Sequence, residues 1–188
     1  MNKKTLIILV ILFIILTGLV LAYFFIFKKT LPQQNAQTEI NKDGFVIELP
    51  DGWVEVEAVM GSFATAMNNK EQINNADAAK IGFRSYYSVV YDTFNEKTNN
   101  DYLEKIETSL KGNFPEVKIS KEEGRNMDGE PIYFMETDII QQDIDFKVLL
   151  AVNIKDKDVW IISFNTLEES WEGYKNLFYQ IAGNFQIK

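Results

Sequence analysis

Two kinds of hydrophobic pattern divide this chain. Residues 6–27 contain no charged side chain and consist mostly of large aliphatic and aromatic residues. As a helix this segment would be about 33 Å long, which is enough to cross the hydrocarbon core of a bilayer. Beyond residue 43, apolar residues instead alternate with polar ones or recur every three to four positions, as in the strands and helices of a folded domain. We therefore expect a transmembrane helix followed by one globular domain.

The apolar segment has two interpretations. A cleaved signal peptide would be processed near residues 20–22, but its apolar core would span only about 7–15 residues. The longer run favours an uncleaved single-pass signal anchor at residues 6–27. We place the short tail, residues 1–5, in the cytoplasm and the large domain outside it, at the membrane of a bacterial cell.

A polar segment connects this anchor to the domain. Residues 28–43 contain one proline and no aromatic residue, a composition typical of a flexible linker. The domain then occupies residues 44–188, a normal size for a single hydrophobic core.

The domain begins with an apolar run, a turn and a tryptophan, "FVIELPDGW". Residues 45–49 have the pattern of a strand, which Pro50 would end because it lacks a backbone N–H. Asp51-Gly52 is typical of a turn. Trp53 then starts a second extended segment, and we expect it to pack on a sheet edge or a helix. Stacking on a ligand is the alternative role for Trp53.

The remaining pattern predicts further strands and two longer helices. Possible capping boxes, Thr98 with Asp101 and Thr166 with Glu169, would start the helices, and a polar segment from Asn68 fits a loop or a short surface helix. Alternation predicts strands at residues 81–92 and 144–154, and apolar runs indicate further strands at residues 62–67 and 159–166. A hairpin is predicted with its turn at Asp128-Gly129.

Alternation also predicts which side chains face solvent. The strand at residues 144–154 would bury one face and expose the other. In the strand at residues 81–92, Tyr87 and Tyr91 would face the core. This leaves Tyr86 and the nearby Phe94 as candidates for an exposed contact surface.

Three stretches of the domain resemble the PsbP-like family: "LPDGW" at residues 49–53, "DGEPIYFMETDII" at residues 128–140, and "VWIISFNTLEESWEGYKNLFYQIAGNFQI" at residues 159–187. The resemblance implies an α+β fold, in which helices cover both faces of an antiparallel sheet as an α/β/α sandwich. The family includes extrinsic proteins that assist the oxygen-evolving complex of photosystem II, and bacterial envelope proteins. The same fold occurs in a Ran-binding nuclear import factor. The predicted anchor departs from the soluble lumenal members, so we transfer the fold and not the photosystem role.

Charge narrows the range of partners. Four of the 19 basic residues flank the apolar segment, which leaves 15 against 27 acidic residues in the rest of the chain, a net charge of −12. Nucleic acids and anionic lipid surfaces require a basic protein surface. We therefore expect no nucleic-acid partner, and contact with membrane lipid only through the N-terminal helix.

The available side chains also limit the chemistry. The chain has no cysteine and no histidine, so thiolate nucleophiles, the commonest general base and the usual zinc ligands are missing. A serine–lysine dyad stays open in principle, although neither Ser62 nor Ser163 lies in a recognisable motif. Carboxylates at i, i+2 spacing on strands, Asp143 with Asp145 and Glu136 with Asp138, could contribute to a calcium or manganese site, but a solvated acidic face is the better explanation.

We assign no catalytic, cofactor-binding or metal-binding residue. The sequence predicts a non-enzymatic binding or accessory module for an envelope protein complex, held at the membrane by its anchor. A carboxylate-based cation-binding protein or a metal-dependent hydrolase is the alternative.

Overall fold

The computed structural model of the protein describes residues 38–59 and 61–188. In this part of the chain, seven antiparallel strands form one sheet and three short strands form a second. The large sheet has the order β3-β4-β5-β9-β8-β7-β6: β3 (Trp53–Val56), β4 (Ala64–Asn68), β5 (Tyr86–Thr93), β9 (Asp158–Leu167), β8 (Ile144–Lys155), β7 (Pro131–Gln141) and β6 (Lys118–Arg125). The small sheet has the order β1-β2-β10: β1 (Glu39–Lys42), β2 (Phe45–Glu48) and β10 (Gln186–Ile187).

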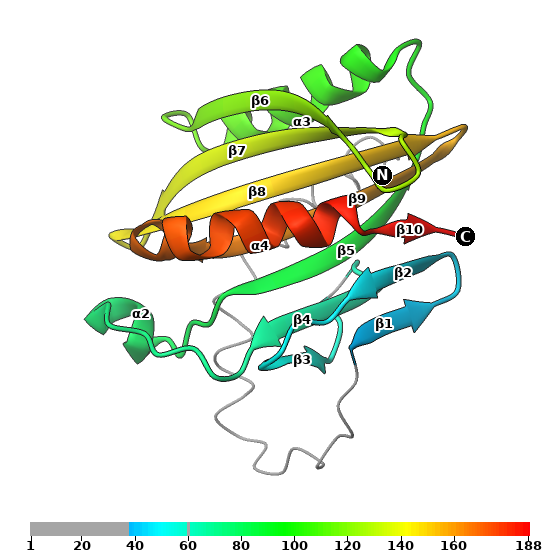
Figure 1. Cartoon of the computed structure of the whole chain (residues 1–188). Helices are drawn as coiled ribbons and strands as arrows, with labels where there is room; N and C mark the ends of the chain where they lie inside the picture. Colours follow the sequence, from blue (N-terminus) through cyan, green and yellow to red (C-terminus); the bar gives the residue numbers. More distant parts are fainter. Residues whose placement is uncertain (1–37, 60) are drawn as a thin grey trace.

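Helices cover both faces of the large sheet, as Figure 1 shows. The helix α4 (Trp171–Gly183) and the small sheet pack on one face, where Phe178 and Ile47 share a core with Phe164. The helix α3 (Asn99–Asn113) packs on the opposite face, against residues such as Leu150. A short helix, α2 (Ala76–Lys80), closes a smaller cluster around Phe83 and Phe146. This is the α+β architecture with antiparallel sheets that the sequence predicts.

Because both faces are covered, the central strands are buried on both sides. In β8, residues 148–153 are all buried, so the prediction that one face of this strand is exposed to solvent is wrong. Tyr86 is only 5% exposed and contacts Phe83, which contradicts its assignment as an exposed residue. Phe94 is half-buried, with its ring 6.1 Å from that of Tyr102 on α3. Alternation along one strand cannot reveal that a second layer covers its outer face.

The folded part begins earlier than predicted. Glu39–Lys42 forms β1 and pairs with β2, although the prediction placed residues 28–43 in a linker. Ile40 explains the difference, because its side chain is fully buried in the core beneath the small sheet.

The predicted tail and anchor, residues 1–5 and 6–27, lie outside the described residues. Within the described residues, no helix is long and apolar enough to cross a membrane.

Trp53 has a packing role. The backbone N–H of Trp53 donates to the carbonyl of Pro50 across the predicted turn, with an N–O distance of 3.0 Å. Its indole is 6% exposed and stacks on Tyr87, with ring centroids 5.5 Å apart, while the edge-on ring of Phe178 in α4 lies 6.1 Å away. Packing against both the sheet and a helix is therefore confirmed.

The two predicted capping boxes have different outcomes. At α3, the Thr98 hydroxyl accepts from the Asp101 N–H and the Asp101 carboxylate accepts from the Thr98 N–H, which confirms the box. The box at Thr166 is wrong, since Thr166 still belongs to β9 and its buried hydroxyl hydrogen-bonds Ser85. The chain passes through a 3₁₀ turn (Glu168–Ser170) before α4 begins at Trp171.

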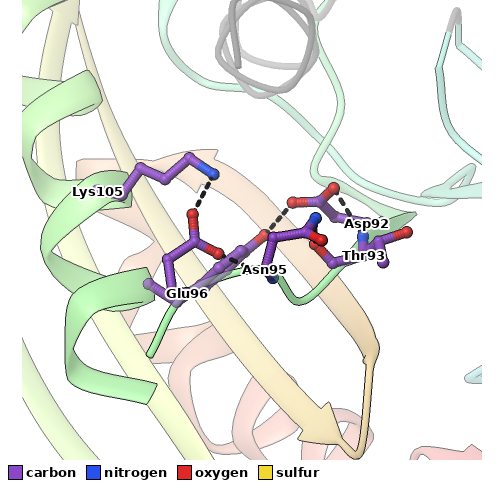
Figure 2. A network of polar contacts seen from close by, with 6 residues as sticks. Asp92, Thr93, Asn95, Glu96 and Lys105 are labelled. Carbon is purple, nitrogen blue, oxygen red and sulfur yellow. Dashed lines mark hydrogen bonds and ion pairs between the residues drawn. The ribbon is translucent and has the colours of Figure 1, made fainter. Parts of the chain in front are cut away.

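A polar network fixes the connection between β5 and α3 (Figure 2). The Asp92 carboxylate accepts from the Tyr102 hydroxyl and from the Thr93 N–H, both at 2.7 Å. The Lys105 ammonium donates to Glu96 at 2.7 Å. Burial alone would raise the pKa of Glu96, but hydrogen bonds from Lys105 and from the Asn95 backbone outweigh it and lower that pKa. The network thereby anchors the first turns of α3 to the end of β5.

Glu107 ties α3 to the edge strand β6, which predicts an acid-dependent loss of stability. Its carboxylate accepts from Lys111 on the same helix and from Lys121 on β6, both at 2.6 Å, and these hydrogen bonds hold the pKa of Glu107 below its ordinary value. A lowered folded-state pKa stabilises the fold above the unfolded-state pKa, and this contribution disappears as pH falls through the folded-state value. Glu107→Gln should therefore lower the free energy of unfolding at pH 7 by up to about 1 kcal/mol.

Urea unfolding of the wild-type protein and of Glu107→Gln between pH 7 and pH 3 provides the measurement. The difference between wild type and Glu107→Gln should shrink below about pH 4. Glu104→Gln is the matched control, because Glu104 lies exposed on the same helix and forms no ion pair in the described part of the chain. A difference that stays constant down to pH 3 would contradict the assignment.

Candidate functional site

A groove of about 710 Å³ opens at one end of the large sheet. Its wall on one side is the turn between α3 and β6, residues 113–118. Its floor is the end of β7, residues 138–140, and the start of β8 at Asp145 and Phe146. Glu168, just after β9, completes the rim. The groove thus collects residues that are far apart in the sequence.

Carboxylates dominate the charged groups of this groove. Its lining includes four of them and one lysine: Glu116, Asp138, Asp145, Glu168 and Lys118. Asp138 accepts from Lys147 at 2.6 Å. In the described part of the chain the other three carboxylates form no ion pair. The groove therefore has an excess of negative charge, which a basic partner would neutralise.

An exposed isoleucine lies at the edge of the groove. Ile140 is 68% exposed, whereas its neighbour Ile139 is 2% exposed and belongs to the core under α3. An apolar contact surrounded by charged groups is a common arrangement in protein interfaces, so Ile140 and the groove together form a candidate binding site. The exposure of Ile140 could not be predicted from the sequence, because the run "DII" shows no clear alternation at the end of its strand.

The structure separates one of the two carboxylate pairs that the spacing had suggested and joins the other through Lys147, whose ammonium lies 3.7 Å from Glu136 and 2.6 Å from Asp138. Asp143 sits in the β7–β8 turn, while Asp145 reaches the groove. Glu136 lies half-buried beneath α4, where it accepts from the Tyr179 hydroxyl at 2.8 Å and pairs with Lys175 at 3.1 Å. Among residues 38–59 and 61–188, no group of three or more acidic side chains is arranged to hold a metal ion.

In the part of the chain that the structure describes, the hydroxyls of the two serines considered for nucleophilic chemistry hydrogen-bond to uncharged groups. The Ser62 hydroxyl donates to the Val59 carbonyl at 2.8 Å. The buried Ser163 hydroxyl accepts from the Asn165 amide at 3.1 Å.

A polar cluster that no sequence pattern predicts lies near α4, around Ser85. Ser85 donates both its N–H and its hydroxyl to the Glu71 carboxylate, and its hydroxyl is 2.7 Å from that of Thr166. Burial together with the nearby Glu71 charge raises the pKa of Tyr174 to about 12. Because Ser85 and Thr166 are fully buried, we interpret this cluster as structural support for the segment that carries Glu71.

The family model that describes PsbP matches residues 37–187, which is nearly all of the described part of the chain. The chain belongs to the PsbP family. The resemblance noted in the three sequence stretches is therefore confirmed. Among curated proteins, none matches this sequence.

Two solved structures share this PsbP fold. Cyanobacterial PsbP (CyanoP) from Synechocystis sp. PCC 6803 is similar with a TM-score of 0.60 and 17% identity, over 86% of this chain and 99% of that protein. LpqN of Mycobacterium tuberculosis is similar with a TM-score of 0.56 and 10% identity, over 80% of this chain and 90% of that protein. At these identities the likeness establishes the fold of the PsbP domain, and the groove must be interpreted from its own residues.

Proposed function

We propose that this protein is a membrane-anchored accessory module. A single-pass anchor at residues 6–27 would hold the PsbP domain outside the cytoplasm, where it binds a protein of the cell envelope without catalysing a reaction. The open acidic groove with Ile140 at its edge carries this proposal. Such a surface offers an apolar contact and a charged rim, the arrangement found in protein interfaces.

The fold relatives and the composition support the same interpretation. The structurally similar LpqN is described as involved in cell envelope biogenesis, which gives a precedent for this fold in an envelope process. The chain lacks histidine and cysteine, the side chains most used for acid–base and nucleophilic chemistry. The alternative of a cation site or metal-dependent hydrolase gains no support from the described residues, where no suitable group of ligands occurs.

One experiment tests both the location and the groove, because the natural chain contains no cysteine. Ile140→Cys in the full-length protein is reacted in intact cells with a membrane-impermeant maleimide that carries a photoreactive group. Illumination should give one recurrent adduct with an envelope protein, visible after purification of the tagged chain. Adding Asp145→Lys to Ile140→Cys should abolish this adduct, because the reversed charge repels a basic partner.

Lys157→Cys is the matched control. Lys157 is exposed in the turn between β8 and β9, at the end of the sheet opposite the groove. It should react with the reagent to the same extent and give no recurrent adduct. No reaction at either cysteine in intact cells would overturn the extracytoplasmic location. Reaction without an adduct specific to Ile140→Cys would overturn binding through the groove.

A further inference from the structure

The groove lies where the ladder between β6 and β7 stops early. β7 pairs with β8 as far as Gln141, which lies opposite Ile144. Its pairing with β6 on the other side ends at Asp138, which lies opposite Lys118. Residues 139–141 of β7 therefore have a strand on one side and the groove on the other.

The β7–β8 turn shows which backbone groups face the groove. Its two central residues, Gln142 and Asp143, have positive φ angles of 53° and 62°, as a type I′ hairpin turn requires. In such a hairpin the flanking pair, Gln141 and Ile144, exchanges hydrogen bonds, and the next pair along the strands does not. Ile140 and Asp145 form this next pair. The N–H and C=O of Ile140 therefore point away from β8, toward the groove.

The strand β6, which would have paired with the backbone of Ile140, ends before it reaches this residue. If β6 continued in the same register, Glu116 would lie opposite Ile140. Instead the chain makes a turn in which the Val117 N–H donates to the Phe114 carbonyl at 2.9 Å. Pro115 in this turn has no N–H to offer a ladder. The result is one vacant strand position beside Ile140, within the groove.

We propose that an extended segment of the partner protein occupies this vacant strand position. It pairs with Ile140 through two main-chain hydrogen bonds and places an apolar side chain beside that of Ile140. A lysine or arginine two residues away lies on the same face and reaches the groove carboxylates at Glu116 and Asp145. This inference rests on the proposed function and specifies how the groove recognises its partner. Charge complementarity favours a basic segment over a second copy of this acidic chain.

Peptide selection on the full-length chain in detergent micelles tests this mode of binding. A displayed library of random peptides provides the probes, and selected sequences should combine a lysine or arginine with an apolar residue at i, i+2 spacing. A synthetic copy of a selected peptide is then methylated at one backbone nitrogen at a time. Methylation should weaken binding about tenfold or more at one position, the residue whose N–H donates to the Ile140 carbonyl, and not at its two neighbours, whose N–H groups point away from β7.

Ile140→Pro tests the same contact from the protein side. Proline removes the N–H that faces the groove and leaves the β8 ladder bonds of Ile139 and Gln141 in place. Ile140→Pro should weaken peptide binding about tenfold or more, whereas Ile140→Val, which keeps the N–H, should stay within about twofold. If Ile140→Pro does not fold, the N-methyl series decides the question alone.

Several outcomes would overturn the strand-pairing proposal. These are a selection that yields no binding peptide, an N-methyl series in which no single position stands out, or a self-association of the chain that Ile140→Pro abolishes. The last outcome would make a second copy the occupant. Each of them leaves the adduct expected from Ile140→Cys in cells untouched, so failure of this inference and failure of the proposed function can be told apart.

Discussion

Replacing Phe178 with alanine is expected to lower the free energy of unfolding by about 3–5 kcal/mol. Phe178 is fully buried between α4 and the large sheet. Its ring stacks on Phe164 of β9 at 4.9 Å and meets the edge of Trp53 at 6.1 Å, so it joins the helix to two separate strands. Removing the ring leaves a cavity that this aromatic cluster cannot fill without moving the helix.

Chemical denaturation monitored by tryptophan fluorescence provides the measurement for Phe178→Ala. Phe63→Ala is the matched control, because Phe63 is 51% exposed and its ring meets those of Tyr91 and Trp160 edge-on. Phe63→Ala should lower the free energy of unfolding by less than about 1.5 kcal/mol. Equal losses for the two variants would mean that α4 does not pack on the sheet through Phe178.

Two adjacent isoleucines should respond very differently to the same substitution. Ile139→Ala is expected to lower the free energy of unfolding by about 2–5 kcal/mol, because this side chain is buried in the core under α3. Ile140→Ala should change it by less than about 0.5 kcal/mol, because two thirds of that side chain is already in water. Thermal and urea unfolding of both variants provides the comparison.

The two alanine variants also test whether Ile140 lies at the groove. A one-residue shift in the pairing of β7 would exchange the faces of Ile139 and Ile140 and reverse the two results. Ile140→Ala, although neutral for stability, should weaken the peptide binding described above, since it removes the apolar contact at the groove edge. A strongly destabilised Ile140→Ala would show that this side chain belongs to the core and would contradict its role in binding.

Local patterns predicted much of the fold because the interactions behind them are local. The Thr98–Asp101 capping box joins groups three residues apart, and the Asp128-Gly129 turn is set by glycine's tolerance of positive φ. The apolar stripe of α4, with Trp171, Phe178 and Ile181 buried, follows from helical periodicity alone.

Local patterns failed where distant segments meet. Thr166 and Glu169 have the spacing of a capping box, but a hydrogen bond to Ser85, 81 residues earlier in the chain, holds the Thr166 hydroxyl in the core. Alternation predicted an exposed Tyr86, yet a cluster that includes residues of α2 and β8 covers it. Burial by a second layer depends on the tertiary arrangement and leaves no periodic signal in the buried strand itself.

The sequence by itself determined the class of this protein: an α+β domain of the PsbP family, strongly acidic, without histidine or cysteine. Only the tertiary structure revealed the groove at which we propose that a partner binds. The groove exists because the turn at Pro115 ends the pairing of β6 before β7 reaches its hairpin, which leaves the backbone of Ile140 open beside Glu116 and Asp145. Such a vacancy is a relation between three strands, so no single stretch of sequence could reveal it.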